Sequence, residues 1–376
     1  MNLKSSRCII ATAFVAVAIP AQLAAQKKQQ QVHHKYKLFD LGAFGGPGSQ
    51  FSDGNPPYIK LMNNRGIAVG AADRSTPDPY FPNCLTDCFV ALGFQFQNGA
   101  VTKLGALPGV NTSFPFAINE RDVVIGVSEN GTVDPLTGFP ELDPVRWVKG
   151  TIHSLGTLGG TQGVALDIND RGQVVGGALN AIPDPFAAQF DSASIFLFPG
   201  TTEARGFLWQ DGVMQDLGSL GGPDSVALYV NERGEVAGQS FLSFTPNPTT
   251  GIPTQDPFLW LPCDRDYSDN DYNSDRESGI GKNGRMLDLG TLGGTFGLVA
   301  GLNNRGQVIG QSNLAGDHTH YPFLWERGHM KDLGTLGGDF GYATWLNEDG
   351  EVVGVASLPI PCPGCEQGPQ VYHGFF

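Results

Sequence analysis

The feature that most constrains this chain of 376 residues is an internal repeat. The segment Asp-Leu-Gly-Thr-Leu-Gly-Gly occurs at residues 288–294 and again at 332–338. Such a repeat implies that each copy forms the same small unit, which becomes stable by packing against its neighbours. Four related copies complete a set of six, at residues 40–46, 103–109, 154–160 and 216–222.

Two further elements recur along the chain. An Asn-x-x-Gly segment lies between two short apolar runs, as at residues 302–310, and a Phe-Leu-Trp segment ends at Trp209, Trp260 and Trp325. The Asn-x-x-Gly spacing favours a type I turn with Gly in the left-handed conformation, and the Asn side chain can bond to the backbone two residues on. Asp122 replaces the Gly in one copy and tolerates that conformation. Each repeat therefore predicts four short strands.

These strands predict an all-β fold. Four antiparallel strands repeated every 44 to 72 residues are typical of β-propeller blades, so six repeats predict a six-bladed β-propeller of four-stranded blades. The chain opens at residues 36–42 with a fourth strand that lacks its first three, and stops at residues 373–376 with a third strand that lacks its fourth. Pairing of the N-terminal strand with the C-terminal strands would close blade six and leave no open edge. A truncated, open array is the alternative.

The combined pattern of Phe-Leu-Trp, Asp-Leu-Gly-Thr-Leu-Gly-Gly and Asn-x-x-Gly-x-Val-Val-Gly resembles the bacterial extracellular HAF-repeat family over residues 36–376. The His-Ala-Phe signature of that family is poorly kept, because residues 373–375 read His-Gly-Phe and residues 205–207 read Arg-Gly-Phe. The resemblance implies secretion and a β-propeller-like repeat fold. It implies no established activity and no catalytic residues.

The N-terminus predicts export. Two basic residues precede an apolar run over residues 8–20, and small residues follow, as in a secretory signal peptide over residues 1–25. A retained membrane anchor is the alternative, and no later segment is long and apolar enough to cross a bilayer. We expect a polar linker over residues 26–35 and a single propeller domain over 36–376, in a monomer secreted to the extracellular space or the periplasm.

The charge balance argues against two classes of partner. The chain carries 37 Asp and Glu residues against 23 Lys and Arg, a net charge of −14. An acidic surface repels nucleic acid and anionic membranes, so we expect neither as a partner.

Five cysteines lie beyond the signal segment. Cys84 and Cys88 fall in a loop of blade one, and Cys362 and Cys365 in a loop of blade six, which would be its neighbour after closure. A zinc site with four thiolates is conceivable, but disulfides are the usual state in an exported protein. We therefore predict two disulfides among these four residues, with their connectivity open, and an unpaired thiol at Cys263.

The loops between the second and third strands are long and share one face of the predicted propeller, whereas tight turns share the other. Long loops on a rigid scaffold usually carry binding, so we expect ligands on the long-loop face. The longest loop contains Phe186, Phe190 and Phe196, which form either an aromatic lid over the channel or a segment packed on neighbouring blades. The six loops span residues 71–89, 129–143, 179–203, 241–255, 313–320 and 357–371.

An acidic insertion over residues 264–277 follows the third strand of blade four. Its oxygen-bearing side chains are spaced like the ligands of a calcium loop, but an Asp stands where such loops need Gly. A solvated insertion is the favoured interpretation and calcium is the alternative; we expect no other cofactor. The residues that would bind calcium are Asp266, Ser268, Asn270 and Glu277.

Asp317, His318 and His320 form a compact cluster in another loop of the same face. They are candidates for ligand or metal binding and for acid–base chemistry, although we favour a solvent-exposed polar loop. The Asp that begins most repeat copies is interpreted as supporting a turn. Lys103 and Ser154 replace this Asp without disturbing the repeat, as a structural role allows.

The function predicted from these features is that of a secreted binding or scaffold module acting through the long-loop face, with glycan or an envelope component as its ligand. The alternative is an extracellular propeller hydrolase or lyase that acts on glycans or small esters, which would need carboxylates or His residues from different blades at the channel mouth. A purely structural role in cell-surface assembly is a third hypothesis. No motif for a nucleophile elbow, a metalloprotease or a phosphate loop is present, so no catalytic residue is predicted.

Overall fold

The computed structural model describes residues 38–51, 60–84, 87–187, 200–248, 250–263, 277–281, 284–361 and 370–376. The chain divides into two compact units, Met1–Asp40 and Leu41–Phe376, and all strands belong to the second. Every regular element among the described residues is a β-strand, as predicted. In this part of the chain no helix is long and apolar enough to cross a bilayer.

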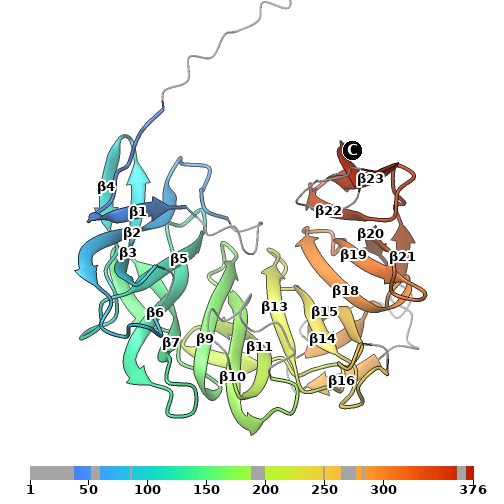
Figure 1. Cartoon of the computed structure of the whole chain (residues 1–376), viewed down its shortest axis with the longest axis horizontal. Helices are drawn as coiled ribbons and strands as arrows, with labels where there is room; N and C mark the ends of the chain where they lie inside the picture. Colours follow the sequence, from blue (N-terminus) through green and yellow to red (C-terminus); the bar gives the residue numbers. More distant parts are fainter. Residues whose placement is uncertain are drawn as a thin grey trace, which may run out of the picture. The chain divides into compact units, whose positions relative to one another are not determined.

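The first three repeats each form a meander of four antiparallel strands, which we call repeat sheets 1 to 3 (Figure 1). Sheet 1 comprises β1 (Gly45–Gln50), β2 (Ala68–Pro77), β3 (Phe89–Gln97) and β4 (Ala100–Lys103). Sheet 2 comprises β5 (Ser113–Ile118), β6 (Val124–Val133), β7 (Pro140–Val148) and β8 (Thr151–Ser154). Sheet 3 comprises β9 (Gly159–Ile168), β10 (Val174–Pro183), β11 (Thr202–Gln210) and β12 (Val213–Asp216).

The last three repeats follow the same order with two variations. Sheet 4 comprises β13 (Ser225–Val230), β14 (Val236–Phe241), β15 (Gln255–Pro262), β17 (Gly284–Asp288) and an additional strand, β16 (Glu277–Gly281), which pairs with β17. Sheet 5 comprises β18 (Gly293–Leu302), β19 (Val308–Leu314), β20 (His320–Glu326) and β21 (His329–Asp332). Sheet 6 has three strands, β22 (Gly341–Leu346), β23 (Val352–Pro361) and β24 (Gln370–Phe375).

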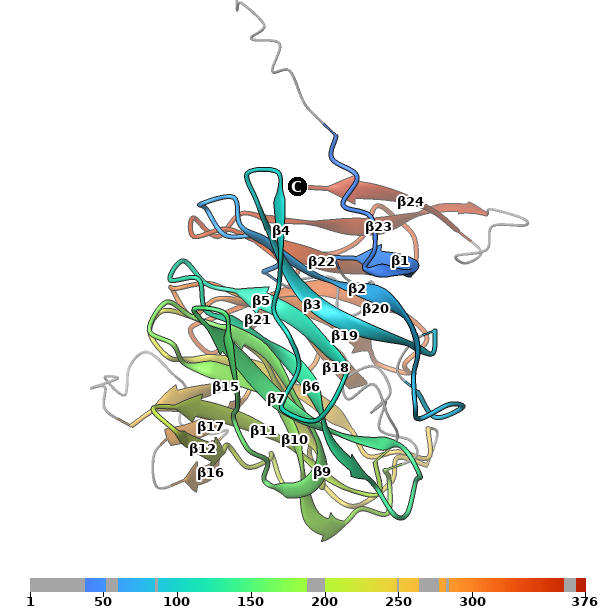
Figure 2. The same cartoon turned by 90° about the vertical axis from the view of Figure 1, so that its left-hand side faces the viewer.

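Consecutive repeat sheets lie side by side in chain order (Figures 1 and 2). The first strands β5, β9, β13, β18 and β22 contact one another in sequence, so they form the inner edge of the arrangement. Single parallel bridges, Leu142 with Gln162 and Gln255 with Phe296, join sheet 2 to sheet 3 and sheet 4 to sheet 5.

The hydrophobic core lies between neighbouring sheets. Phe207 and Trp209 of β11 pack in one buried cluster with Ile125 of β6, and Phe323 and Trp325 of β20 pack in another with residues of sheet 4. The Phe-Leu-Trp element of one repeat therefore fills the space against the preceding repeat, and burial of these large side chains contributes on the order of 2–3 kcal/mol each.

The Asn-x-x-Gly turns have the predicted conformation. Gly172, Gly234 and Gly306 have positive φ angles of 83°, 81° and 76°, and Asp122, which replaces Gly, has a φ of 59°. In all six turns the Asn Oδ1 accepts a hydrogen bond from the backbone N–H two residues on. These turns connect the first and second strands of each repeat.

The Asp of the heptapeptide supports a turn, as predicted. Asp216, Asp288 and Asp332 each accept a hydrogen bond from the N–H of the Gly two residues on, at 2.7–2.8 Å. Ser154 makes the same bond through Oγ, at 3.1 Å. The substitution therefore preserves the turn because a hydroxyl can accept the same N–H.

The loops between the second and third strands are shorter than predicted. After a register shift past Asp73, pairing of β2 with β3 resumes at Pro77 with Phe89, and the same happens in sheets 2, 3 and 6. A β-bulge lets a strand bend and continue, so residues expected in loops lie in strands. At the N-terminus, residues 38–42 form no strand and residues 36–37 lie outside the described residues, so pairing of residues 36–42 with β24 stays a prediction.

Candidate functional site

Residues of the long-loop face of sheet 1 line a small cavity of about 170 Å³. Asp73 of β2 and Asp87 of the following loop bring two carboxyl groups to it, and Phe114 of β5 brings an apolar surface from the next sheet. A concave site with a few convergent polar groups is the usual form of a ligand site. The full lining is Gly48, Ser49, Gln50, Ala71, Asp73, Asp87 and Phe114.

The two carboxyl groups lie close together. Asp73 is only 9% exposed, and its Oδ2 accepts a hydrogen bond from Gly48 N at 2.9 Å. Burial raises the pKa of Asp73, and the neighbouring charge of Asp87 raises it further, whereas the Gly48 N–H acts in the opposite direction. A protonated Asp73 can therefore donate a hydrogen bond to Asp87, and both groups have oxygen atoms that can accept hydrogen bonds from a ligand.

A disulfide holds the loop that carries Asp87. Cys84 and Cys88 are bonded to each other, which confirms one disulfide among the four predicted cysteines. The Cys88 carbonyl accepts a hydrogen bond from Asp78 N at 2.9 Å, and Asp87 Oδ1 accepts one from Phe89 N at 3.2 Å. These bonds fix both ends of the loop beside the cavity.

A second acidic group lies between sheets 1 and 2. Asp78, Thr112 and Glu129 are 3%, 1% and 1% exposed. Burial raises the pKa of Glu129 to about 7, the charge of Asp78 adds to this, and Thr112 acts in the opposite direction. Burial likewise raises the pKa of Asp78. The charged forms of both groups are therefore disfavoured in this interior.

Asp78 belongs to a repeated Asp-Pro step that the sequence analysis missed. Asp78, Asp134 and Asp184 each precede a Pro, and each Oδ1 accepts a hydrogen bond from the N–H two residues on. Asp134 Oδ2 also accepts from Thr161 Oγ1 of the next sheet, at 2.7 Å. The sequence feature that indicates this step is the recurrence of Asp-Pro at the same place in three repeats.

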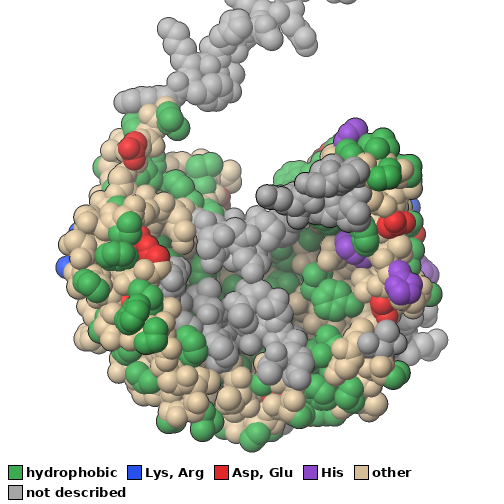
Figure 3. Space-filling model, in the orientation of Figure 1, with side chains coloured by type: hydrophobic (Ala, Val, Ile, Leu, Met, Phe, Trp, Pro, Cys, Tyr) green, Lys and Arg blue, Asp and Glu red, His purple; other side chains and the backbone are tan. Residues whose placement is uncertain are grey.

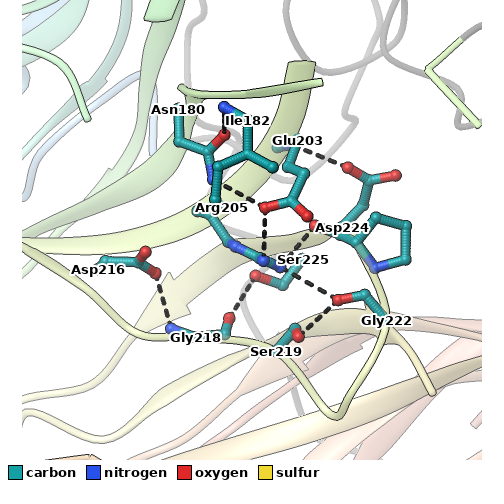
Figure 4. Close-up of polar contacts among 12 residues, drawn as sticks. Asn180, Ile182, Glu203, Arg205, Asp216, Gly218, Ser219, Gly222, Asp224 and Ser225 are labelled. Atoms are coloured by element: carbon teal, nitrogen blue, oxygen red, sulfur yellow. Dashed lines mark hydrogen bonds and ion pairs between the residues drawn. The ribbon is translucent and has the colours of Figure 1, made fainter. Parts of the chain in front are cut away.

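Between sheets 3 and 4 another group of buried carboxyls lies beside a basic side chain (Figure 4). Arg205 Nη2 lies 2.7 Å from Glu203 Oε2, and Arg205 also donates to the backbone carbonyls of Gly222 and Pro223. Asp224 Oδ1 accepts from Ala204 N at 2.8 Å. Burial raises the pKa of Asp224 to about 7, and Asp184 adds to this. This cluster joins two sheets, and none of its residues lines the cavity described above.

Exposed apolar side chains accompany the second-to-third-strand connections. Figure 3 shows hydrophobic side chains spread over the side of the molecule seen in Figure 1, with few Lys or Arg among them. Large apolar side chains at these connections are 51–77% exposed in five of the six sheets. They are Phe81, Leu136, Ile182, Phe244 and Ile360.

The predicted binding residues have separate environments. Phe186 is buried in a hydrophobic cluster with Leu179, whereas Phe190 and Phe196 lie outside the described residues. Asp317 has a φ of 59° and accepts hydrogen bonds from Thr295 and Asn313, so it supports its loop.

His318 is exposed, and the ring of His320 stacks against Phe340 with centroids 4.9 Å apart. Burial lowers the pKa of His320. His318 therefore has the exposed position that was expected, whereas His320 begins β20 and is partly buried.

Other predicted residues lie wholly or partly outside the described part of the chain. These are Asp266, Ser268 and Asn270 of the acidic insertion, and Cys362 and Cys365. Glu277 begins β16, but its side chain is not described. Cys263 is an exposed free thiol, as predicted. Among the described residues no group of three or more His, Cys, Asp or Glu side chains is arranged to hold a metal.

No model of a known protein family matches the chain, and no curated protein matches it in sequence. Among solved structures, acylaminoacyl peptidase from Pyrococcus horikoshii is similar over 78% of this chain, with 11% sequence identity and a TM-score of 0.37. The matched region spans 42% of that peptidase chain. A likeness at this level carries no argument about fold or function.

Proposed function

We propose that this chain is a secreted binding module of the HAF-repeat type that holds a neutral, hydroxyl-rich ligand such as a glycan in the cavity of sheet 1. The carrying observation is the paired carboxyls of Asp73 and Asp87 beside an apolar surface from Phe114. Carboxylates accept bonds from sugar hydroxyls, while Ser49 and Gln50 can donate or accept. The net charge of −14 disfavours an anionic ligand.

The size of the cavity restricts the ligand further. A volume of about 170 Å³ is smaller than the usual pocket for a drug-sized molecule, so it suits one terminal sugar unit of a longer chain. The exposed apolar side chains at neighbouring connections would then contact the rest of that chain.

The test is a binding screen of the mature protein against neutral oligosaccharides, followed by calorimetry with the best one. We expect Asp87→Ala to weaken its affinity roughly 10-fold or more, because charge-assisted hydrogen bonds are lost. Asp349→Asn is the control, because that exposed residue lies in an Asn-x-x-Gly turn at the other end of the strands. The proposal would be refuted if none of the oligosaccharides binds, or if Asp87→Ala binds the best one as tightly as the wild type does.

Hydrolysis is the second candidate, favoured by the same carboxyl pair. A protonated Asp73 beside Asp87 could act in acid–base catalysis, but the two groups lie closer together than the carboxyls that flank a glycosidic bond in most glycosidases. Hydrolysis would be established if the wild type releases cleavage products from the oligosaccharide and both Asp73→Asn and Asp87→Asn do not. The two groups come from a single repeat sheet, which differs from the convergence of several blades that such an enzyme was expected to show.

We further propose that the unit closes as a six-bladed propeller through its first and sixth repeats. In each of the first five repeats, the turn Asn donates a hydrogen bond through Nδ2 to the backbone carbonyl of the turn Asn in the next repeat. A bond from Asn347 of the sixth repeat to Asn63 of the first would complete the series. Met62 and Trp345, beside these turns, are 66% and 59% exposed and would become buried by closure.

Engineered cysteines test this closure. Asn64→Cys combined with Glu348→Cys should form a disulfide mapped by peptide mass spectrometry if repeats 1 and 6 meet. Asn64→Cys with Glu120→Cys is the reference pair, because Asn64 already bonds to Glu120 at 2.8–2.9 Å. If a disulfide forms in the reference pair but not between residues 64 and 348, the closure is contradicted.

A further inference from the structure

Four buried oxygen atoms between sheets 1 and 2 lack a hydrogen-bond partner. They are Asp78 Oδ2, Thr112 Oγ1 and both carboxylate oxygens of Glu129. Each is shielded from water in a residue no more than 3% exposed. A buried carboxylate left without a partner is costly, by several kcal/mol in practice. The arrangement therefore calls for a group that would satisfy these oxygens.

The three side chains face one another. Glu129 N donates to the Thr112 carbonyl at 3.2 Å, which places the two residues side by side. The Thr112 hydroxyl lies next to the carboxyls of both Asp78 and Glu129, and the backbone N–H groups of Asn111 and Thr112 lie beside the Glu129 carboxylate, but none of these donors reaches good hydrogen-bond geometry. The charges of Asp78 and Glu129 act on each other. The oxygens thus converge from two repeat sheets onto one point.

Three other buried carboxylates of the unit each contact a basic side chain. Lys60 Nζ lies 3.0 Å from Asp167 Oδ1, Arg205 contacts Glu203, and Arg233 donates to Glu235. No Lys or Arg among the described residues contacts Asp78 or Glu129 in this way. Two buried carboxylates and a hydroxyl without a counter-charge form a donor set of hard oxygens, which Ca²⁺ prefers.

We propose that Asp78, Thr112 and Glu129 bind a Ca²⁺ ion that joins sheet 1 to sheet 2. Glu129 supplies one or both carboxylate oxygens, Asp78 supplies Oδ2 and Thr112 supplies its hydroxyl. Ca²⁺ fits better than Mg²⁺, because Mg²⁺ retains several waters and these oxygens are out of contact with solvent. The disulfide loop that begins at Asp78 would then be anchored at its base.

The site differs from the acidic insertion that the sequence suggested for calcium. It lies between two repeat sheets, and its ligands come from residues 51 positions apart in the chain (129 − 78 = 51). Its second carboxylate has no counterpart in the next junction, where Asp134 is already bonded to Thr161 and Asn180 bonds to Glu203. Asp134 therefore provides a matched control.

The test is the Ca²⁺ dependence of the melting temperature at pH 8, with Tb³⁺ luminescence as the direct binding readout. The wild type should melt higher in millimolar Ca²⁺ than in a chelator, and should bind Tb³⁺ that Ca²⁺ displaces. Glu129→Gln and Asp78→Asn should each weaken this binding roughly 10-fold or more. Asp134→Asn should retain it. The readouts do not involve glycan, so they are independent of the function proposed above.

Two outcomes would overturn the site. A melting temperature unaffected by Ca²⁺ in the wild type would mean that protons alone neutralise these carboxyls. A Ca²⁺ effect that persists in both Glu129→Gln and Asp78→Asn but disappears in Asp266→Asn would assign the ion to the acidic insertion. If one variant fails to fold, the other still decides the result.

Discussion

Asn231 Nδ2 donates a hydrogen bond to the backbone carbonyl of Asn303, 72 residues further along the chain, at 2.9 Å. The same Asn accepts from Arg233 N and Glu235 N through Oδ1, so one buried side chain shapes its own turn and ties two repeat sheets together. Equivalent inter-repeat bonds of 2.9–3.2 Å join every consecutive pair of repeats. A local turn signal thus also sets the order of the sheets.

Replacement of this Asn tests its double role. Asn231→Ala should lower the free energy of unfolding by roughly 1–3 kcal/mol, because it leaves buried backbone groups without partners. Denaturant unfolding followed by fluorescence would measure the loss. Asn64→Ala is the control, since Asn64 is exposed and should cost less than about 1 kcal/mol. Equal losses in the two variants would contradict a special role for the buried Asn.

A glycine in the second strand of sheet 5 permits close approach of the first strand. A Cβ at Gly310 would lie 1.8 Å from the Leu298 carbonyl oxygen, so Gly310→Ala must displace backbone and should destabilise the fold by about 3 kcal/mol or more. Gly374→Ala is the control, because its nearest contact would be an ordinary 3.7 Å. Thermal unfolding of both variants measures the difference, and a Gly310→Ala melting temperature equal to that of the control would refute it.

Asp224 should make stability depend on pH. Its pKa rises from 3.8 to about 7 on folding, mainly through burial and then through Asp184, with Glu203 adding and Arg205 opposing. The folded state therefore binds more protons between these values, so stability should fall as pH rises from about 4 to about 7 and level off above.

In a chelator, which removes Ca²⁺, Asp224→Asn should reduce this fall, and a double variant that adds Glu129→Gln should reduce it further, because burial also raises the pKa of Glu129 to about 7. Unfolding free energies at a series of pH values measure the slope. If the unfolding free energy of the double variant depends on pH as steeply as that of the wild type, these two groups do not cause the pH dependence.

The Cys84–Cys88 disulfide should stabilise its loop more than the whole fold. Because it closes a short loop, Cys84→Ser should cost only about 1–2 kcal/mol. Oligosaccharide affinity should fall more clearly, since the loop carries Asp87. Cys263→Ser, which removes an exposed free thiol, should change neither. Alkylation of both Cys84 and Cys88 in the native protein without reductant would contradict the disulfide.

Local patterns in the sequence determined the strands and turns. Gly234 requires a positive φ, Asn231 supports the turn before it, and Asp216 supports the heptapeptide turn, all through contacts within a few residues. Such short-range signals are read directly from spacing, because the chain itself brings the groups together. The order of strands in each repeat follows from the same signals.

Only the tertiary structure decided what lies between the repeats. The Asp-Pro step that contains Asp78 recurs in the sequence, but its meeting with Thr112 and Glu129 depends on how one sheet packs on the next. The cavity beside Asp73 and Asp87 likewise depends on a bulge that extends β2 and on the position of the disulfide loop. Burial, which raises the pKa of Asp73, Asp78 and Glu129, is a property of the packed sheets, whereas the turns are a property of the local chain.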